Sequence, residues 1–122
     1  MHDLNLPIKF IEFLKKKNWK LFEYQTNLLE SLNNSLISRF LISSDTGTGK
    51  TISLFLPIFI DNLKNQTKRI IYISPLKSIL SDLYDNLNIL ISELGLKIGI
   101  DKRTGDESSL KKKKQLENPK EI

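Results

Sequence analysis

Residues 39–51 read RFLISSDTGTGKT, and this stretch decides the fold that the sequence predicts. Its first part, from Arg39 to Ser44, is a short apolar run typical of a buried strand. Gly47 and Gly49 follow the run, and the residues from Ile52 to Leu63 are apolar almost all round. This order predicts a buried strand, a glycine-containing loop and a buried helix.

The same kind of unit follows further along the chain. A second apolar run, RIIYIS at 69–74, ends at Pro75, and leucines and isoleucines with helical spacing continue as far as Gly95. The run LKIGI at 96–100 offers a third strand. Because strands and helices alternate, we expect an α/β fold in which a parallel sheet lies between two layers of helices.

Further helices are predicted on both sides of this unit. Apolar residues with helical spacing occur at 8–14 and from about Tyr24 to Ser38, and a Lys-rich segment at 110–117 also favours a helix. We therefore divide the chain into N-terminal helices at 1–38 and a truncated three-layer α/β/α domain at 39–122. The four consecutive lysines at 111–114 could bind nucleic acid, but a solvated helix face is the favoured interpretation.

The composition excludes several classes of protein. The chain has 122 residues, a formal net charge of +5, no Cys and a single His, so disulfide frameworks, zinc enzymes and serine–histidine hydrolases are excluded. The longest apolar run, at 52–60, is too short to cross a bilayer. Residues 1–7 lack the basic start of a secretory signal, and we therefore expect a cytoplasmic protein.

The loop SSDTGTGKT at 43–51 matches the end of the Walker A pattern of P-loop proteins, which bind nucleotides. Gly47 and Gly49 can turn consecutive backbone amides toward one point, where the N-terminus of the next helix also attracts anions. Lys50 would neutralise the β- and γ-phosphates, and the Thr51 hydroxyl would bind Mg²⁺. The alternative is a plain glycine turn followed by an exposed Lys.

The motifs together resemble those of superfamily 2 helicases, the DEAD/DEAH-box group. The segment from Ser44 to Thr51 is similar to their phosphate loop A-x-T-G-x-G-K-T, with Ser for Ala. WKLFEYQ at 19–25 looks like their Q-motif region, although Trp19 and Phe22 could equally be core residues. The resemblance implies that Lys50 and Thr51 are catalytic, that Thr51 binds Mg²⁺, and that ATP is bound by Gln25, through the adenine edge, and by Thr46, Gly47, Thr48, Gly49, Lys50 and Thr51.

Two other segments resemble nucleic-acid-binding motifs of the same group. YISPLKSIL at 72–80 is similar to motif Ia, and RTGD at 103–106 resembles a segment found most closely in Lhr-type (large helicase-related) enzymes. Both follow predicted strands, so they would lie at the carboxyl edge of the sheet, where ligands of such folds bind. Taken singly, Lys77 could be a solvated helix residue and 103–106 a polar turn. The resemblance implies contacts to the DNA or RNA backbone from Pro75, Leu76, Lys77, Thr104 and Gly105.

The resemblance covers nearly the whole chain but not the residues that hydrolyse ATP. Hydrolysis in this group needs an Asp-Glu pair after an apolar strand, and the only Asp-Glu here, Asp106-Glu107, lies in a polar turn. We therefore expect the ATP-binding portion of a RecA-like helicase domain, inactive by itself and completed by the remainder of a longer enzyme. The alternatives are a non-catalytic remnant that binds nucleic acid or a protein partner, and an unrelated P-loop NTPase.

Overall fold

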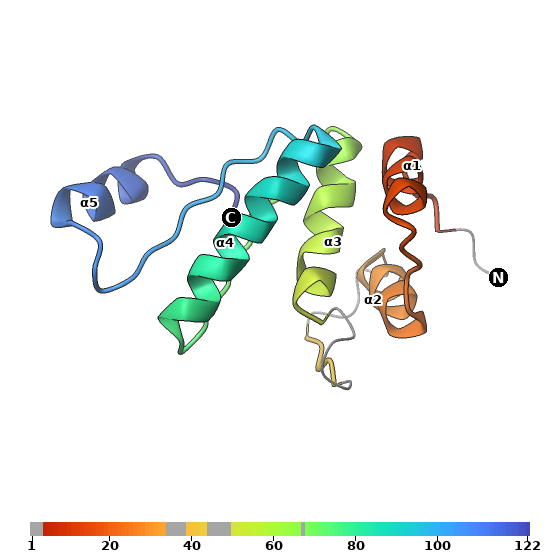
Figure 1. Ribbon diagram of the computed structural model, residues 1–122, viewed down its shortest axis with the longest axis horizontal. Helices are drawn as coiled ribbons and strands as arrows, with labels where there is room; N and C mark the ends of the chain where they lie inside the picture. The colour runs from red at the N-terminus through yellow and green to blue at the C-terminus, as the bar shows by residue number, and fades with distance from the viewer. Residues whose placement is uncertain (1–3, 34–38, 44–49, 67) are drawn as a thin grey trace.

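The computed structural model describes residues 4–33, 39–43, 50–66 and 68–122, and within them the chain forms five helices (Figure 1). Helices are present at each of the five places where the sequence predicts one, with small differences at their ends. The predicted end of the second helix, at Ser38, lies outside the described residues. In Figure 1, α3 lies between α4 on one side and α1 and α2 on the other. The helices are α1 (Ile8–Lys17), α2 (Glu23–Asn33), α3 (Lys50–Leu63), α4 (Lys77–Leu94) and α5 (Ser109–Glu117).

Local sequence signals set the ends of these helices. α1 ends at Asn18, which has a left-handed φ of 53°. α4 ends in the same way at Gly95, where φ is 63° and the absence of a Cβ removes the steric penalty of that conformation. α5 begins after Ser108, whose hydroxyl accepts a hydrogen bond of 3.2 Å from the backbone N–H of Lys111. Local backbone conformation and one side-chain hydrogen bond therefore account for these three helix ends.

α3 forms the centre of the hydrophobic core. Six of its 14 residues are buried, and the side chains of Phe55 and Phe59 are 0% and 1% exposed. One cluster joins them to apolar side chains from α1, α2, α4 and the segment at 96–100. Burial of such a side chain stabilises the fold by roughly 1.5–3 kcal/mol. The buried Phe, Leu and Ile residues of α3 therefore contribute strongly to the stability of the fold. Despite this apolar character, no helix in the described ranges is long and apolar enough to cross a bilayer.

α5 is attached to the rest of the protein by polar contacts. None of its residues is buried. The Gln115 amide donates a hydrogen bond of 3.0 Å to the backbone carbonyl of Lys102. Of the four consecutive lysines, Lys112 is half-buried and the other three are exposed, as expected for a solvated helix face.

The predicted parallel sheet, and with it the three-layer α/β arrangement, is wrong for the described part of the chain. No strand forms at 39–43, 69–74 or 96–100. Residues 70–74 do alternate between half-buried and exposed side chains, as a strand would. Their backbone, however, pairs with the end of the chain: the N–H of Ile70 donates to the carbonyl of Glu121 at 2.7 Å.

The segment at 96–100 also bonds to the end of the chain. The N–H of Ile122 donates to the carbonyl of Gly99 at 3.1 Å, and the N–H of Asp101 donates to the carbonyl of Ile122 at 2.9 Å. A sheet requires a ladder of successive bonds between neighbouring strands. Among the residues described, Glu121 and Ile122 lie between the two segments and supply too few such bonds to make a strand.

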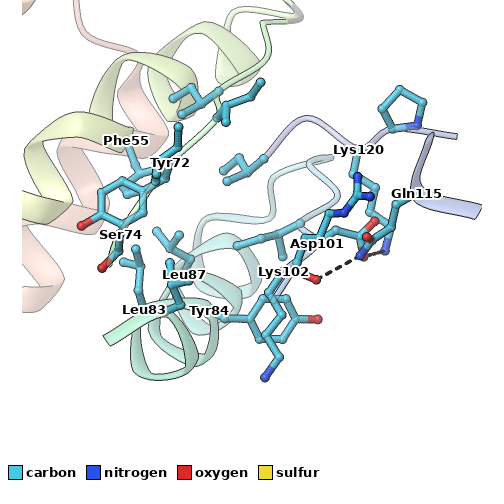
Figure 2. Close-up of a pocket in the computed structure, with 18 residues that line it drawn as sticks. Phe55, Tyr72, Ser74, Leu83, Tyr84, Leu87, Asp101, Lys102, Gln115 and Lys120 are labelled. Carbon is cyan, nitrogen blue, oxygen red and sulfur yellow. Dashed lines mark hydrogen bonds and ion pairs between the residues drawn. The ribbon is translucent and has the colours of Figure 1, made fainter. Parts of the chain in front are cut away.

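A cavity of about 410 Å³ lies between residues 70–74 and residues 100–103 (Figure 2). Figure 2 shows Tyr72 on one side of it, Asp101 and Lys102 on the other, and Leu83 and Leu87 of α4 along its wall. Tyr72 packs against Phe55 of the core, with 5.7 Å between the ring centroids. The core helices therefore cover the inner side of these segments, although the segments do not pair with each other.

The predicted strands that do not form leave large apolar side chains in solvent. Leu41, Ile71 and Ile73 are 93%, 88% and 87% exposed. The strands of a parallel sheet are apolar throughout because helices cover both faces of the sheet. Here the core covers one face of residues 70–74, so every second side chain is left exposed.

The division of the chain at residue 38 into two regions stays a prediction.

Phe59→Ala should lower the free energy of unfolding by about 3–5 kcal/mol, because it removes a large buried side chain from the core around α3. Chemical denaturation followed by far-UV circular dichroism measures the loss. Leu54→Ala on the same helix is the matched control, since Leu54 is 42% exposed. It should change the unfolding free energy by less than about 1 kcal/mol. Equal losses in the two variants would contradict the assignment of the core.

Candidate functional site

Lys50 and Thr51 are the first two residues of α3, and both are half-buried. The N-terminus of a helix carries unpaired N–H groups and a partial positive charge, which attract anions. The two residues line a cavity of about 440 Å³. The predicted ligands Thr46, Gly47, Thr48 and Gly49 lie outside the described residues, so the geometry of the phosphate loop stays a prediction. The other cavity walls are apolar: Leu28, Leu32, Phe40, Ile42, Leu54 and Pro57.

Gln25, the predicted adenine-binding residue, lies in the first turn of α2 and is only 6% exposed. Its Oε1 atom accepts a hydrogen bond of 2.9 Å from the backbone N–H of Phe22. Its Nε2 atom donates a hydrogen bond of 2.8 Å to the hydroxyl of Ser53. Ser53 belongs to α3 and is 0% exposed. The side chain of Gln25 therefore bridges α2 to the helix that begins with Lys50.

Ser53 and Tyr24 were missed by the sequence-based prediction. The Tyr24 hydroxyl lies 3.0 Å from the Ser53 hydroxyl, and the Tyr24 ring stacks on Phe22 with 6.0 Å between centroids. One signal could have revealed Ser53: it is a polar residue in the otherwise apolar run at 52–60. A buried hydroxyl in such a helix needs a hydrogen-bonding partner, and α2 provides it.

A second cavity, of about 560 Å³, adjoins Gln25 on the other side of α3. Trp19 and Phe22 line it and are 47% and 50% exposed, so neither is a fully buried core residue. Ile52 and Leu56 of α3 line this cavity, whereas Leu54 and Pro57 line the cavity next to Lys50. The predicted adenine-binding and phosphate-binding residues therefore border different cavities, with α3 between them.

The two predicted nucleic-acid segments meet at the N-terminus of α4. Pro75 and Leu76 are exposed and directly precede this helix, and Lys77 is its first residue. The Lys77 Nζ lies 3.0 Å from both carboxylate oxygens of Asp106. The N–H of Asp106 in turn donates to the Thr104 hydroxyl at 3.3 Å. Segments that are far apart in the sequence are thus joined by an exposed ion pair.

The Asp106-Glu107 pair takes part in ion pairs with two lysines. Asp106 contacts Lys77, and Glu107 contacts the Lys111 Nζ at 2.7 Å. The hydrogen bond to Glu107 raises the pKa of Lys111 above its ordinary value. The described residues include no group of three or more acidic or His side chains that could hold a metal ion. These contacts agree with the interpretation of the pair as part of a polar turn.

The model of the DEAD/DEAH box helicase family matches residues 22–122. The match includes four of the five helices, from α2 to α5. It also includes every residue predicted to bind ATP or nucleic acid, from Gln25 to Gly105.

Several curated relatives are Lhr helicases. The chain is 40% identical over 96 residues to the ATP-dependent helicase Lhr-Core of Sulfolobus acidocaldarius. The aligned region covers 67% of this chain and 11% of that protein. It is 33% identical over 106 residues to the Lhr helicase/uracil glycosylase of Escherichia coli, covering 67% and 7%. With Lhr-Core of Methanocaldococcus jannaschii the identity is 29% over 136 residues, covering 98% and 16%. The chain spans less than a fifth of the length of these relatives, and no solved structure matches it significantly.

Gln25→Ala should lower the free energy of unfolding by about 1–3 kcal/mol, because the Phe22 N–H and the Ser53 hydroxyl each lose a buried partner. Urea denaturation measures the change. Gln66→Ala is the matched control, since Gln66 is exposed in the turn after α3. That substitution should change the unfolding free energy by less than about 0.5 kcal/mol. A Gln25 variant as stable as the control would rule out the bridge between α2 and α3.

Proposed function

We propose that this chain, which belongs to the DEAD/DEAH box helicase family, supplies the ATP-binding part of an ATP-dependent superfamily 2 helicase that acts on DNA or RNA. The observation that carries the proposal is the family match over residues 22–122, within which Lys50 and Thr51 begin the buried helix α3. Because the chain spans a small part of its relatives, the remainder of the helicase would complete the domain and supply the groups that hydrolyse ATP. The cytoplasmic location is part of the same proposal.

Phosphate binding is proposed for the loop at 46–49 and for the start of α3. Lys50 would contact the β- and γ-phosphates as a point charge, supported by the partial positive charge of the helix N-terminus. The Thr51 hydroxyl fits Mg²⁺, which prefers oxygen ligands and usually takes few of them from the protein. When bound, Mg²⁺ would bridge the phosphates and reduce their negative charge. The half-buried position of both side chains supports this assignment, since a partly dry site strengthens charge interactions.

Adenine recognition is proposed for Gln25. A carboxamide has two lone pairs on Oε1 and two hydrogens on Nε2. Phe22 occupies one lone pair and Ser53 takes one hydrogen. One acceptor and one donor position are therefore left for a base, and adenine presents a complementary donor and acceptor at N6 and N7.

Binding of the nucleic-acid backbone is proposed for the surface at the start of α4, made of Pro75, Leu76 and Lys77 with Thr104 and Gly105. Lys77 is the charged member and would contact a phosphate without reading sequence. Asp106 now neutralises it through an exposed ion pair, which contributes little stability and can exchange readily for a phosphate. Such contacts do not distinguish DNA from RNA.

Lys50→Ala should abolish the binding of ATP, because it removes the positive charge proposed to lie against the terminal phosphates. Titration of the protein with a fluorescent ATP analogue and Mg²⁺ measures the affinity. Lys64→Ala is the charge-matched control, since Lys64 is exposed just beyond the other end of α3. ATP affinity retained in the Lys50 variant would overturn the phosphate-loop assignment.

Lys77→Ala should weaken binding to single-stranded nucleic acid and lower the slope of log affinity against log salt by about 0.7, because one phosphate contact is lost. Fluorescence anisotropy at several salt concentrations measures both quantities. Lys97→Ala is the control, since Lys97 is exposed beyond the opposite end of α4. Asp106→Asn should strengthen binding, because it removes the carboxylate that competes for Lys77. An unchanged salt slope in the Lys77 variant would argue against this contact.

A further inference from the structure

We propose that Ser53 is a positioning residue that holds the amide of Gln25 in the orientation that selects adenine over guanine. This inference rests on the proposed function, because it needs an ATP site that includes Gln25. It assigns a role to a residue inside the nucleotide-binding helix that contacts no phosphate in the proposed site. The observation behind it is the buried hydrogen bond of 2.8 Å from Gln25 to Ser53.

The donors and acceptors of this contact define the orientation of the amide. A backbone N–H can only donate, so the Gln25 atom 2.9 Å from the N–H of Phe22 is the oxygen. The nitrogen then faces the Ser53 hydroxyl, which accepts its hydrogen bond. Reversing the amide would set two donors against each other at Phe22. Two contacts therefore hold the amide. The N–H of Phe22, just before α2, holds its oxygen, and the Ser53 hydroxyl on α3 holds its nitrogen.

Burial makes this orientation rigid. Ser53 is 0% exposed and Gln25 is 6% exposed, so water has little access to the bond between them if the amide rotates. Loss of a partner in such a place leaves a polar group unsatisfied, which is more costly than the bond itself is stabilising. The Tyr24 hydroxyl, 3.0 Å from that of Ser53, adds a further polar contact at the same point.

The orientation matches one purine and not the other. With the amide held as described, Oε1 has a lone pair for the adenine N6 amino group and Nε2 has a hydrogen for N7. Guanine presents acceptors at both O6 and N7, so its O6 would meet the amide oxygen without a proton between them. An amide free to rotate could offer its nitrogen to guanine O6. Removing the Ser53 contact should therefore reduce discrimination between the bases.

Ser53 also connects base recognition to phosphate binding. It lies three residues after Lys50 on α3, about one helical turn away. Because both residues belong to one rigid helix with a buried apolar face, the Gln25 amide is held at a constant distance from the proposed phosphate site. Direct contact between Ser53 and the nucleotide is not needed for this role.

The test is a double-mutant cycle on base preference in the full-length protein. Affinities for fluorescent analogues of ATP and GTP, each with Mg²⁺, are measured for the wild type, Ser53→Ala, Gln25→Ala and the double variant. The GTP:ATP ratio of dissociation constants should fall about tenfold in Ser53→Ala, because ATP affinity falls while GTP affinity stays the same or rises. In the Gln25→Ala background the same substitution should have no further effect on the ratio. Ser81→Ala is the control, since it removes a hydroxyl from α4 that contacts Lys102 instead.

Each of the other outcomes overturns a stated part of the inference. An unchanged ratio in Ser53→Ala, or equal loss of ATP and GTP affinity, would reduce Ser53 to a structural residue. A further fall of the ratio in the double variant would show that Ser53 does not act through Gln25. If Ser53→Ala does not fold, Ser53→Cys keeps the volume with a weaker acceptor and should give an intermediate ratio. A wild type without base preference would overturn the role of Gln25, and one that binds neither nucleotide would overturn the proposed function itself.

Discussion

The burial of α3 organises the hydrophobic core of this protein. Its apolar residues surround the helix, so neighbours must cover it on more than one side, and α1, α2 and α4 do so. Phe55 and Phe59 fill the contact with these helices. Contacts with α3 therefore position α1, α2 and α4, whereas α5 contributes no buried residue to this core.

The same constraint positions the candidate site. Lys50 and Thr51 occupy the first turn of α3, so packing of Phe55 and its neighbours fixes where their side chains emerge. Ser53 is the one polar position in the buried part of this helix, and it is matched by Gln25 from α2. A buried polar pair of this kind stabilises little by itself, but it penalises any other alignment of the two helices. It thereby specifies the relative position of α2 and α3 more narrowly than apolar packing does.

The extended segments behave differently, because their stability depends on neighbours. Residues 70–74 and 96–100 have the composition of buried parallel strands, yet they make backbone hydrogen bonds mainly with Glu121 and Ile122. A helix satisfies its own backbone, whereas a strand requires a second strand of adequate length. Exposed Ile71 and Ile73 are the consequence. Burial of these side chains would require a further strand or helix packed over them.

Sequence patterns alone predicted the five helices, the end of α4 at Gly95 and the family to which the chain belongs, because these depend on local periodicity, on helix-ending residues and on linear motifs. The tertiary structure was needed to show that the runs at 69–74 and 96–100 bond to Glu121 and Ile122 and not to each other, since no local pattern specifies which distant backbone groups will meet. It also decided that Gln25 bonds to Ser53 and that Lys77 pairs with Asp106. Both contacts join residues that lie 28 and 29 positions apart, which no helical or strand period relates. The hydrogen bond arises because α2 packs against α3, and the ion pair arises because the turn at 103–106 lies next to the start of α4.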